Sequence, residues 1–417
     1  MSENQATPDG TGGDGRPRLR RRLTLPLLTL YGLGVTIGAG IYVLVGAAAA
    51  KAGIYAPVSF LLAACVVGFT SLSYCEMATR YHVSAGEAAY VRQGFNSRIL
   101  SLIVGLMVVA SGVVSSAAVA IGTAGYLEAF IPLSPALLTA LIILLVGLIA
   151  IWGILESVAL ASLFTVIEIG GLGLVVWVGL ADAPQGWSDI AGLIPPLESG
   201  AWKGIAAAGL LAFFAFVGFE DIANVAEEVK QPGKTLPRGI ILTLIIATMT
   251  YFTVVSVVVL VVPMTDLVGS TAPLALIFES AGPGMSGLFH IIAIIATFNG
   301  ALIQVIMASR VLYGLANQGS LPRILAGVNP LTKTPLTATV LVVGIILFLA
   351  YFLPISDLAE ATSTIVLIVF CLVNLALLRL KLSKVPAKGD VFQVPMAIPV
   401  LGFASSGCLL LAGFFLS

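Results

Sequence analysis

Four glycines lie close together in the first strongly apolar stretch of the chain, within the sequence Gly32-Leu33-Gly34-Val35-Thr36-Ile37-Gly38-Ala39-Gly40-Ile41-Tyr42. A glycine inside a helix costs about 1 kcal/mol relative to alanine, and a helix that breaks in hydrocarbon must find new partners for the backbone groups it releases. Amides at the start of a half-helix bind carboxylates, and released carbonyls bind cations or ammonium groups. The pattern therefore predicts a substrate site built from main chain.

A second break is predicted at Gly218, within residues 209–221 (GLLAFFAFVGFED), where apolar aromatic residues precede the glycine and two acids follow it. We expect amides from the first break to hold a substrate carboxylate and carbonyls from both breaks to hold its ammonium group. Phe214 or Phe216 is placed to close over the bound molecule. The alternative is that the glycines only allow helices to pack closely. The predicted substrate-binding residues are Thr36, Ile37, Gly38, Ala39, Gly40, Ile41, Phe213, Phe214, Ala215, Phe216, Val217, Gly218 and Asn299.

Glu168 is the one ionisable residue deep inside an apolar stretch, in the sequence Phe164-Thr165-Val166-Ile167-Glu168-Ile169-Gly170. A charge at the centre of a membrane span costs about 2.5–3.5 kcal/mol or more, so burial favours the neutral form. This suits a carrier of a coupling proton; the alternative is a permanently protonated, structural glutamic acid. Glu220, just after the second break, is the other proton-coupling candidate, and its alternative role is to cap the half-helix that follows.

The composition excludes a soluble domain. Hydrophobic residues make up 59% of the 417 residues and charged residues 10%, whereas soluble domains contain about 25% charged residues. Eleven apolar segments are long enough to cross a bilayer, which needs roughly 20 residues. Their approximate limits are 25–50, 57–79, 99–129, 135–153, 158–181, 203–226, 237–263, 284–315, 336–354, 357–380 and 396–416.

The basic residues set the orientation. With the N-terminus in the cytoplasm, 18 of the 20 Lys and Arg residues fall on the inside and only Lys51 and Lys203 fall outside, as the positive-inside rule requires. We therefore expect a multi-pass protein of the plasma membrane. Residues 1–24 are expected to form a disordered cytoplasmic tail.

The two breaks fall in spans of opposite orientation, the first and the sixth. This predicts an all-α polytopic protein with a five-plus-five inverted repeat, in which spans 1 and 6 are discontinuous. Residues 25–182 form the first repeat, residues 203–381 the second, and residues 396–416 an additional eleventh span.

No cofactor is expected. The four cysteines lie in or beside apolar segments without metal-ligand spacing, and there are only two histidines, so neither a disulfide framework nor a metal site is predicted. A phosphate loop for ATP and a nucleic-acid partner are not expected either. The expected partners are a small amino acid or amine, protons and the lipid bilayer.

The segment from Gly34 to Tyr42 resembles the first-helix motif of the amino acid–polyamine–organocation (APC) superfamily. The segment from Phe213 to Ile240 (FFAFVGFEDIANVAEEVKQPGKTLPRGI) is a stronger match, to the sixth helix and following loop of the cationic amino acid transporter branch and its bacterial relatives. The exit of span 8, from Ser309 to Pro335, also fits. The resemblance covers about residues 25 to 380 and implies the LeuT-like fold and secondary transport.

Three departures from this family pattern stand out. The loop after span 2 has His82 where the family usually has proline, and Ala85-Gly86 where it has a glycine pair. Eleven spans replace the commoner twelve. In span 5, Glu168 aligns with a position where bacterial relatives often carry lysine and where sodium-coupled members of the fold bind a cation.

Together these features predict a secondary active transporter of amino acids, operating by proton-coupled symport and alternating access, and not an enzyme. The alternatives are an exchanger without proton coupling, or a transporter-like amino acid sensor. The identity of the substrate side chain stays open, because the predicted pocket around Phe214, Ala215 and Val217 is apolar while the resemblance is to a branch with cationic substrates. The sequence does not indicate an oligomeric state.

Overall fold

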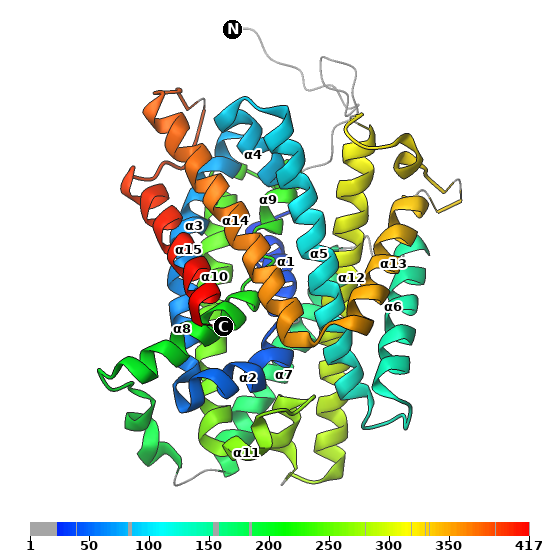
Figure 1. Cartoon of the computed structure of the whole chain (residues 1–417), viewed down its shortest axis with the longest axis vertical. Helices are drawn as coiled ribbons and strands as arrows, with labels where there is room; N and C mark the ends of the chain where they lie inside the picture. The colour runs from blue at the N-terminus through cyan, green and yellow to red at the C-terminus, as the bar shows by residue number, and fades with distance from the viewer. Residues whose placement is uncertain are drawn as a thin grey trace, which may run out of the picture.

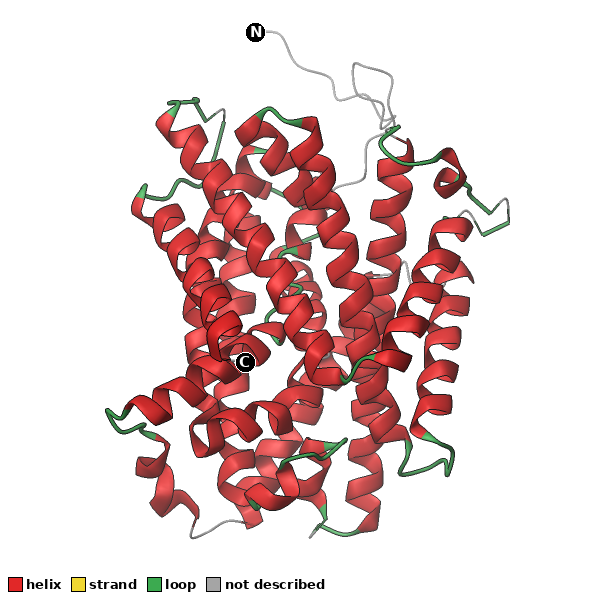
Figure 2. Cartoon of the chain, viewed as in Figure 1, coloured by secondary structure: helices red, strands yellow, loops and turns green. Residues whose placement is uncertain are grey.

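The computed structural model describes residues 23–416 except 39, 82–85, 153–157, 183–185, 280, 318, 330, 333 and 388. This part of the chain is helical apart from loops, turns and one isolated β-bridge between Leu23 and Val229 (Figures 1 and 2). The α-helices are α1 (Leu25–Ile37), α2 (Gly40–Ala52), α3 (Ala56–Arg80), α4 (Gly86–Phe95), α5 (Arg98–Leu127), α6 (Pro135–Trp152), α7 (Val158–Asp182), α8 (Ser199–Phe214), α9 (Asp221–Asn224), α10 (Pro232–Val261), α11 (Met264–Leu267), α12 (Pro283–Asn317), α13 (Leu336–Phe352), α14 (Ile355–Leu382) and α15 (Ala397–Leu416).

Each of the eleven predicted spans overlaps one of these helices or a pair of them. In the described part, eight helical segments are long and apolar enough to cross a membrane, and three apolar helices, α1, α8 and α13, are shorter. Two of the short ones, α1 and α8, are the first halves of the broken spans. The all-α, multi-pass architecture is therefore confirmed.

Spans 1 and 6 are discontinuous where the glycines predict a break. Helix α1 ends at Ile37 and α2 begins at Gly40. Helix α8 ends at Phe214, residues 215–220 form turns, and the short α9 follows at Asp221. Gly218 has φ +120°, a conformation that side-chain-bearing residues rarely adopt. Span 1 is thus interrupted between Ile37 and Gly40, and span 6 between Phe214 and Asp221, in the interior of the helix bundle (Figure 1).

Helix α4 was not among the predicted elements. It follows the loop after α3 and buries Glu87, Tyr90 and Val91, and it lies at the upper end of the molecule in Figure 1. A helix of 10 residues with a charged surface is too short for a search for membrane spans, which explains why it was missed. It covers the end of the bundle closest to α9.

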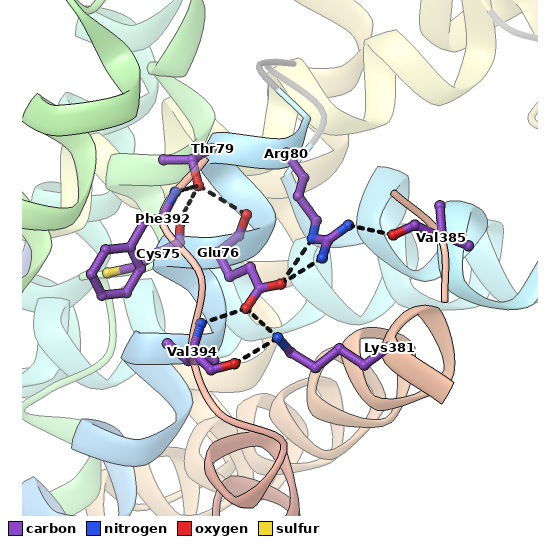
Figure 3. A network of polar contacts seen from close by, with 8 residues as sticks. All are labelled: Cys75, Glu76, Thr79, Arg80, Lys381, Val385, Phe392 and Val394. Atoms are coloured by element: carbon purple, nitrogen blue, oxygen red, sulfur yellow. Dashed lines mark hydrogen bonds and ion pairs between the residues drawn. The ribbon is translucent and has the colours of Figure 1, made fainter. Parts of the chain in front are cut away.

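A buried ion-pair network joins α3 to α14 and to the segment that leads into α15 (Figure 3). The Glu76 carboxylate is fully buried and accepts hydrogen bonds from Arg80 Nε at 2.9 Å and from the main-chain N–H of Val394 at 2.8 Å. It also pairs with Arg80 Nη2 and Lys381 Nζ, each at 2.7 Å. Lys381 donates further to the Val394 carbonyl at 2.6 Å. The carboxylate is therefore fully satisfied by charged and main-chain donors.

Replacing Glu76 with glutamine should destabilise the protein by about 3–5 kcal/mol, because two largely buried cations lose their counter-charge. The midpoint of heat-induced unfolding of the purified protein reports this loss. Glu360→Gln is the matched control, since its partner Lys51 and Glu360 itself are 29% and 22% exposed, and such pairs contribute about 0–1 kcal/mol. Equal shifts in the two variants would contradict this account.

Candidate functional site

The two unwound segments contact each other directly. A Cβ atom added at Gly40 would lie 2.4 Å from Ala215 Cα, and one added at Gly218 would lie 2.7 Å from the Val35 carbonyl oxygen. Any side chain at these positions would collide with backbone, which real Cβ atoms essentially never do. Glycine is therefore required at both positions for the breaks of span 1 and span 6 to lie together, which is the close-packing role given above as the alternative.

Tyr251 of α10 links the two breaks. Its hydroxyl group lies 2.8 Å from the Thr36 carbonyl oxygen and 2.7 Å from the Ala215 carbonyl oxygen. A tyrosine hydroxyl has one proton to donate, so it satisfies one of the two carbonyls fully at any moment. Two carbonyl oxygens that share a single donor have spare capacity for an ammonium group.

The amides at the opposite side of the first break belong to the N-terminus of α2. The first N–H groups of an α-helix have no partner within the helix and carry a partial positive charge. Gly40 and Ile41 are fully enclosed here. Donors suited to a carboxylate thus lie beside acceptors suited to an ammonium group, and their use in binding an α-amino acid stays a prediction.

Glu168 is completely buried in α7 beside the first break. Asn299 of α12 donates from Nδ2 to Glu168 Oε1 at 3.0 Å, and Tyr42 donates to the Glu168 main-chain oxygen at 2.6 Å. The second carboxyl oxygen, Oε2, has no hydrogen-bond partner. It faces Gly38: a Cβ atom at that glycine would lie 3.7 Å from Oε2, 3.6 Å from the Ala296 carbonyl oxygen and 2.7 Å from the Gly34 carbonyl oxygen.

The predicted binding carbonyls of span 6 are less free than the sequence suggests. The Phe213 carbonyl accepts from the Phe216 N–H at 2.9 Å, and the Phe214 carbonyl from the Val217 N–H at 3.1 Å. Tight turns after α8 account for these bonds. In span 6, the Ala215 carbonyl oxygen accepts a hydrogen bond from the Tyr251 hydroxyl group, which also lies within hydrogen-bond distance of Thr36.

The aromatic rings in this region are buried. Phe213 packs edge-on against Phe370 with ring centroids 5.6 Å apart, and Phe216 packs edge-on against Tyr251 at 5.0 Å. Phe214 is 4% exposed. The role of Phe214 or Phe216 as a gate stays a prediction.

The remaining predicted residues divide into three groups. Thr36, Ile37 and Val217 lie at the breaks, and the Thr36 hydroxyl is a buried group without a partner. Glu220 accepts from the main-chain N–H of Gly218 through Oε2 at 2.9 Å, so it holds the unwound turn in place. Ala39 lies outside the described residues.

Sequence reasoning missed the tyrosines that support the breaks. Besides Tyr251, these are Tyr126, which donates to the Tyr42 carbonyl at 2.5 Å, and Tyr42 itself. The available signal was the presence of tyrosine deep in apolar segments, where its hydroxyl needs a partner. Sequence position alone does not show that these partners are main-chain carbonyls at or near the breaks.

Residues 23–417 match the family model for amino acid permeases. The chain belongs to this family. Among its relatives is a branched-chain amino acid permease from Bacillus subtilis, 29% identical over 95% of this chain and 88% of that protein. A methylthioribose transporter from the same species is 29% identical over 94% and 87%. A vacuolar cationic amino acid transporter from Arabidopsis thaliana is 29% identical over 88% of this chain and 64% of that longer protein.

A solved structure shares the fold of this permease. A Na⁺-coupled sialic acid symporter, determined in a substrate-bound outward-open state, superposes with a TM-score of 0.63 at 15% identity, over 98% of this chain and 92% of the other. The APC assignment and the LeuT-like fold are therefore confirmed, as are membership of a transporter rather than an enzyme family and amino acid transport as its general activity.

Removing the Tyr251 hydroxyl should weaken both the fold and substrate binding of the permease. Tyr251→Phe leaves the Thr36 and Ala215 carbonyls without their shared donor, and a buried polar group without a partner costs about 1–3 kcal/mol. The unfolding midpoint and the uptake of labelled amino acids measure the two effects. Tyr351→Phe, at a side chain that is 75% exposed, should change neither the unfolding midpoint nor the uptake. A Tyr251→Phe protein as stable and active as the wild type would show that the hydroxyl does not support the breaks.

Proposed function

We propose that this permease is a secondary active transporter of amino acids in the plasma membrane, which moves its substrate together with a proton by alternating access. The observation that supports proton coupling is the geometry of Glu168: a fully buried carboxyl group with one unpartnered oxygen turned toward the break in span 1.

The protonation state of Glu168 determines whether this arrangement is stable. When neutral, the carboxyl group has an O–H that donates a hydrogen bond, and the Gly34 and Ala296 carbonyl oxygens surround the same point beside Gly38. When ionised, Oε2 would be an unpaired charge facing carbonyl oxygens, which is strongly unfavourable inside a membrane protein. Proton release therefore loosens the contact between α1, α7 and α12, and proton binding restores it.

The substrate would be held by its common atoms. The amides at the start of α2 are placed for the carboxylate, and the carbonyls of Thr36 and Ala215 for the ammonium group. Because α1 and α7 pack beside the same break, binding at the backbone and protonation of Glu168 act on one structural element. This is the physical basis for coupling the two.

The orientation we propose follows the basic residues, with the N-terminus in the cytoplasm. On this basis the ion pair between Lys51 at the end of α2 and Glu360 in α14, at 2.5 Å, lies on the outer side. Both side chains are partly exposed, and an ion pair of this kind contributes little to stability. It is therefore suited to open and close during each cycle.

An exchanger without proton coupling is the second candidate. The hydrogen bond from Asn299 to Glu168 and the complete burial of the carboxyl group are also what a permanently protonated, structural glutamic acid would show. In that case the substrate gradient alone would drive transport.

Uptake by purified protein in liposomes separates these mechanisms. We expect labelled amino acids to accumulate when an inward proton gradient is imposed, and Glu168→Gln to abolish this accumulation while exchange against internal amino acid continues. Glu198→Gln, at an exposed position, is the matched control. The assay is repeated with a sodium gradient in place of the proton gradient.

Two results would contradict proton coupling. One is wild-type uptake that requires internal amino acid and ignores the proton gradient. The other is Glu168→Gln protein that responds to the gradient as the wild type does.

A further inference from the structure

A polar cavity lies next to the unwound segment of span 6, on the side of α4. It leaves about 20 Å³ for a water-sized group, which is enough for one such group and too small for an amino acid. The polar groups that line it are the carboxyls of Glu87, Glu220 and Asp221, the amide of Gln304, and the hydroxyls of Ser111 and Tyr74. They come from α3, α4, α5, α9, α12 and the turn between α8 and α9.

Each of the three carboxyl groups accepts a hydrogen bond from a neighbouring group in the described part of the chain. Tyr74 donates to Glu87 Oε1 at 3.3 Å, the Gly218 N–H to Glu220 Oε2 at 2.9 Å, and Asn224 Nδ2 to Asp221 Oδ1 at 3.1 Å. A carboxylate has about four lone-pair sites on its two oxygens. These bonds fix the carboxyl groups in place and leave acceptor capacity for a group in the cavity.

Gln304 independently indicates a ligand. It lines the same cavity from α12 and is 7% exposed. Among the described residues we find no hydrogen-bond partner for its side-chain amide, although nearly all buried amides in proteins have one. Its amide therefore has hydrogen-bonding capacity for a group in the cavity.

The electrostatics of the cavity favour a cation. None of the described residues that line it is basic, and three neighbouring buried carboxyl groups cannot all ionise without a counter-charge. Burial, and next the charge of Asp221, raise the pKa of Glu87 in α4 from 4.5 to about 7. Near neutral pH this carboxyl group can therefore exchange its proton for another positive charge.

We propose that this cavity binds a monovalent cation of the size of ammonium. An ammonium group has three or four N–H donors at the size of one water molecule, and the cavity presents three carboxyl groups and one amide oxygen as acceptors. Val217, in the unwound segment itself, also lines the cavity. The cation can therefore be a free ion, or the distal ammonium group of a substrate that is held at the breaks.

The test uses the purified full-length protein without any ion gradient, so that the failure of proton-coupled uptake would not affect it. Ammonium chloride should raise the unfolding midpoint, because a ligand that binds only the folded state stabilises it. Tetramethylammonium chloride, which has the same charge but no N–H group and a larger size, should not. Equal effects of the two salts would overturn the proposal.

Two variants assign the effect to the cavity. Glu87→Gln and Gln304→Met nearly preserve side-chain volume and should each weaken ammonium binding by about tenfold or more, as expected for the loss of a hydrogen bond to a charged group. Glu198→Gln should bind ammonium as the wild type does. If Glu87→Gln does not fold, Gln304→Met alone decides, and unchanged ammonium affinity in that variant overturns the proposal.

Competition identifies the source of the cation. Displacement of ammonium by lysine but not by norleucine, which lacks the distal ammonium group, would assign the site to the substrate side chain. Displacement by neither would assign it to a free cation. Displacement by both to the same degree would show that ammonium occupies the general substrate pocket, and the separate site would be refuted.

Discussion

Main chain that leaves a helix inside a membrane protein must be given new hydrogen-bond partners, because no water is available to supply them. The structure around the two breaks is organised by this constraint. Tyr251 reaches both breaks from α10, and Tyr42 and Tyr126 hold the residues around the first one. Gly40 and Gly218 then bring the unwound segments into contact. The same spare donors and acceptors that would destabilise an ordinary helix are the groups that we propose recognise a zwitterion.

Glu76 and Glu168 are both completely buried and differ in the partners of their carboxyl groups. Glu76 has guanidinium, ammonium and main-chain donors on both of its oxygens. Glu168 has one amide donor, and its other oxygen has none. A carboxylate with charged donors on both oxygens has its hydrogen-bonding capacity filled, whereas one with an unpartnered oxygen can still take up a donor. Because both side chains are equally buried, the difference between the two glutamates comes from their hydrogen-bond and ion-pair partners.

Much of this architecture was accessible from the sequence, for identifiable reasons. The limits of the spans follow from hydropathy, and the breaks at Gly38 and Gly218 follow from glycine in otherwise apolar helices. What could not be derived depends on contacts between distant segments. Glu76 and Arg80 are visibly one helical turn apart, but Lys381 and Val394 join them only in the folded chain. Likewise, nothing local indicates that Tyr251 serves Thr36 and Ala215, or that α4 brings Glu87 to Glu220 and Asp221.

The distribution of ion pairs gives the two ends of the bundle different resistance to opening. Lys51 and Glu360 form a partly exposed pair between α2 and α14, and water can replace each partner at little cost. At the opposite end of α14, Lys381 pairs with the buried Glu76 of α3, and separating these groups would leave uncompensated charge in the interior. A transport cycle has to break contacts at one end of the bundle at a time. In α14, we therefore expect the end that carries Glu360 to separate from its partner more readily than the end that carries Lys381.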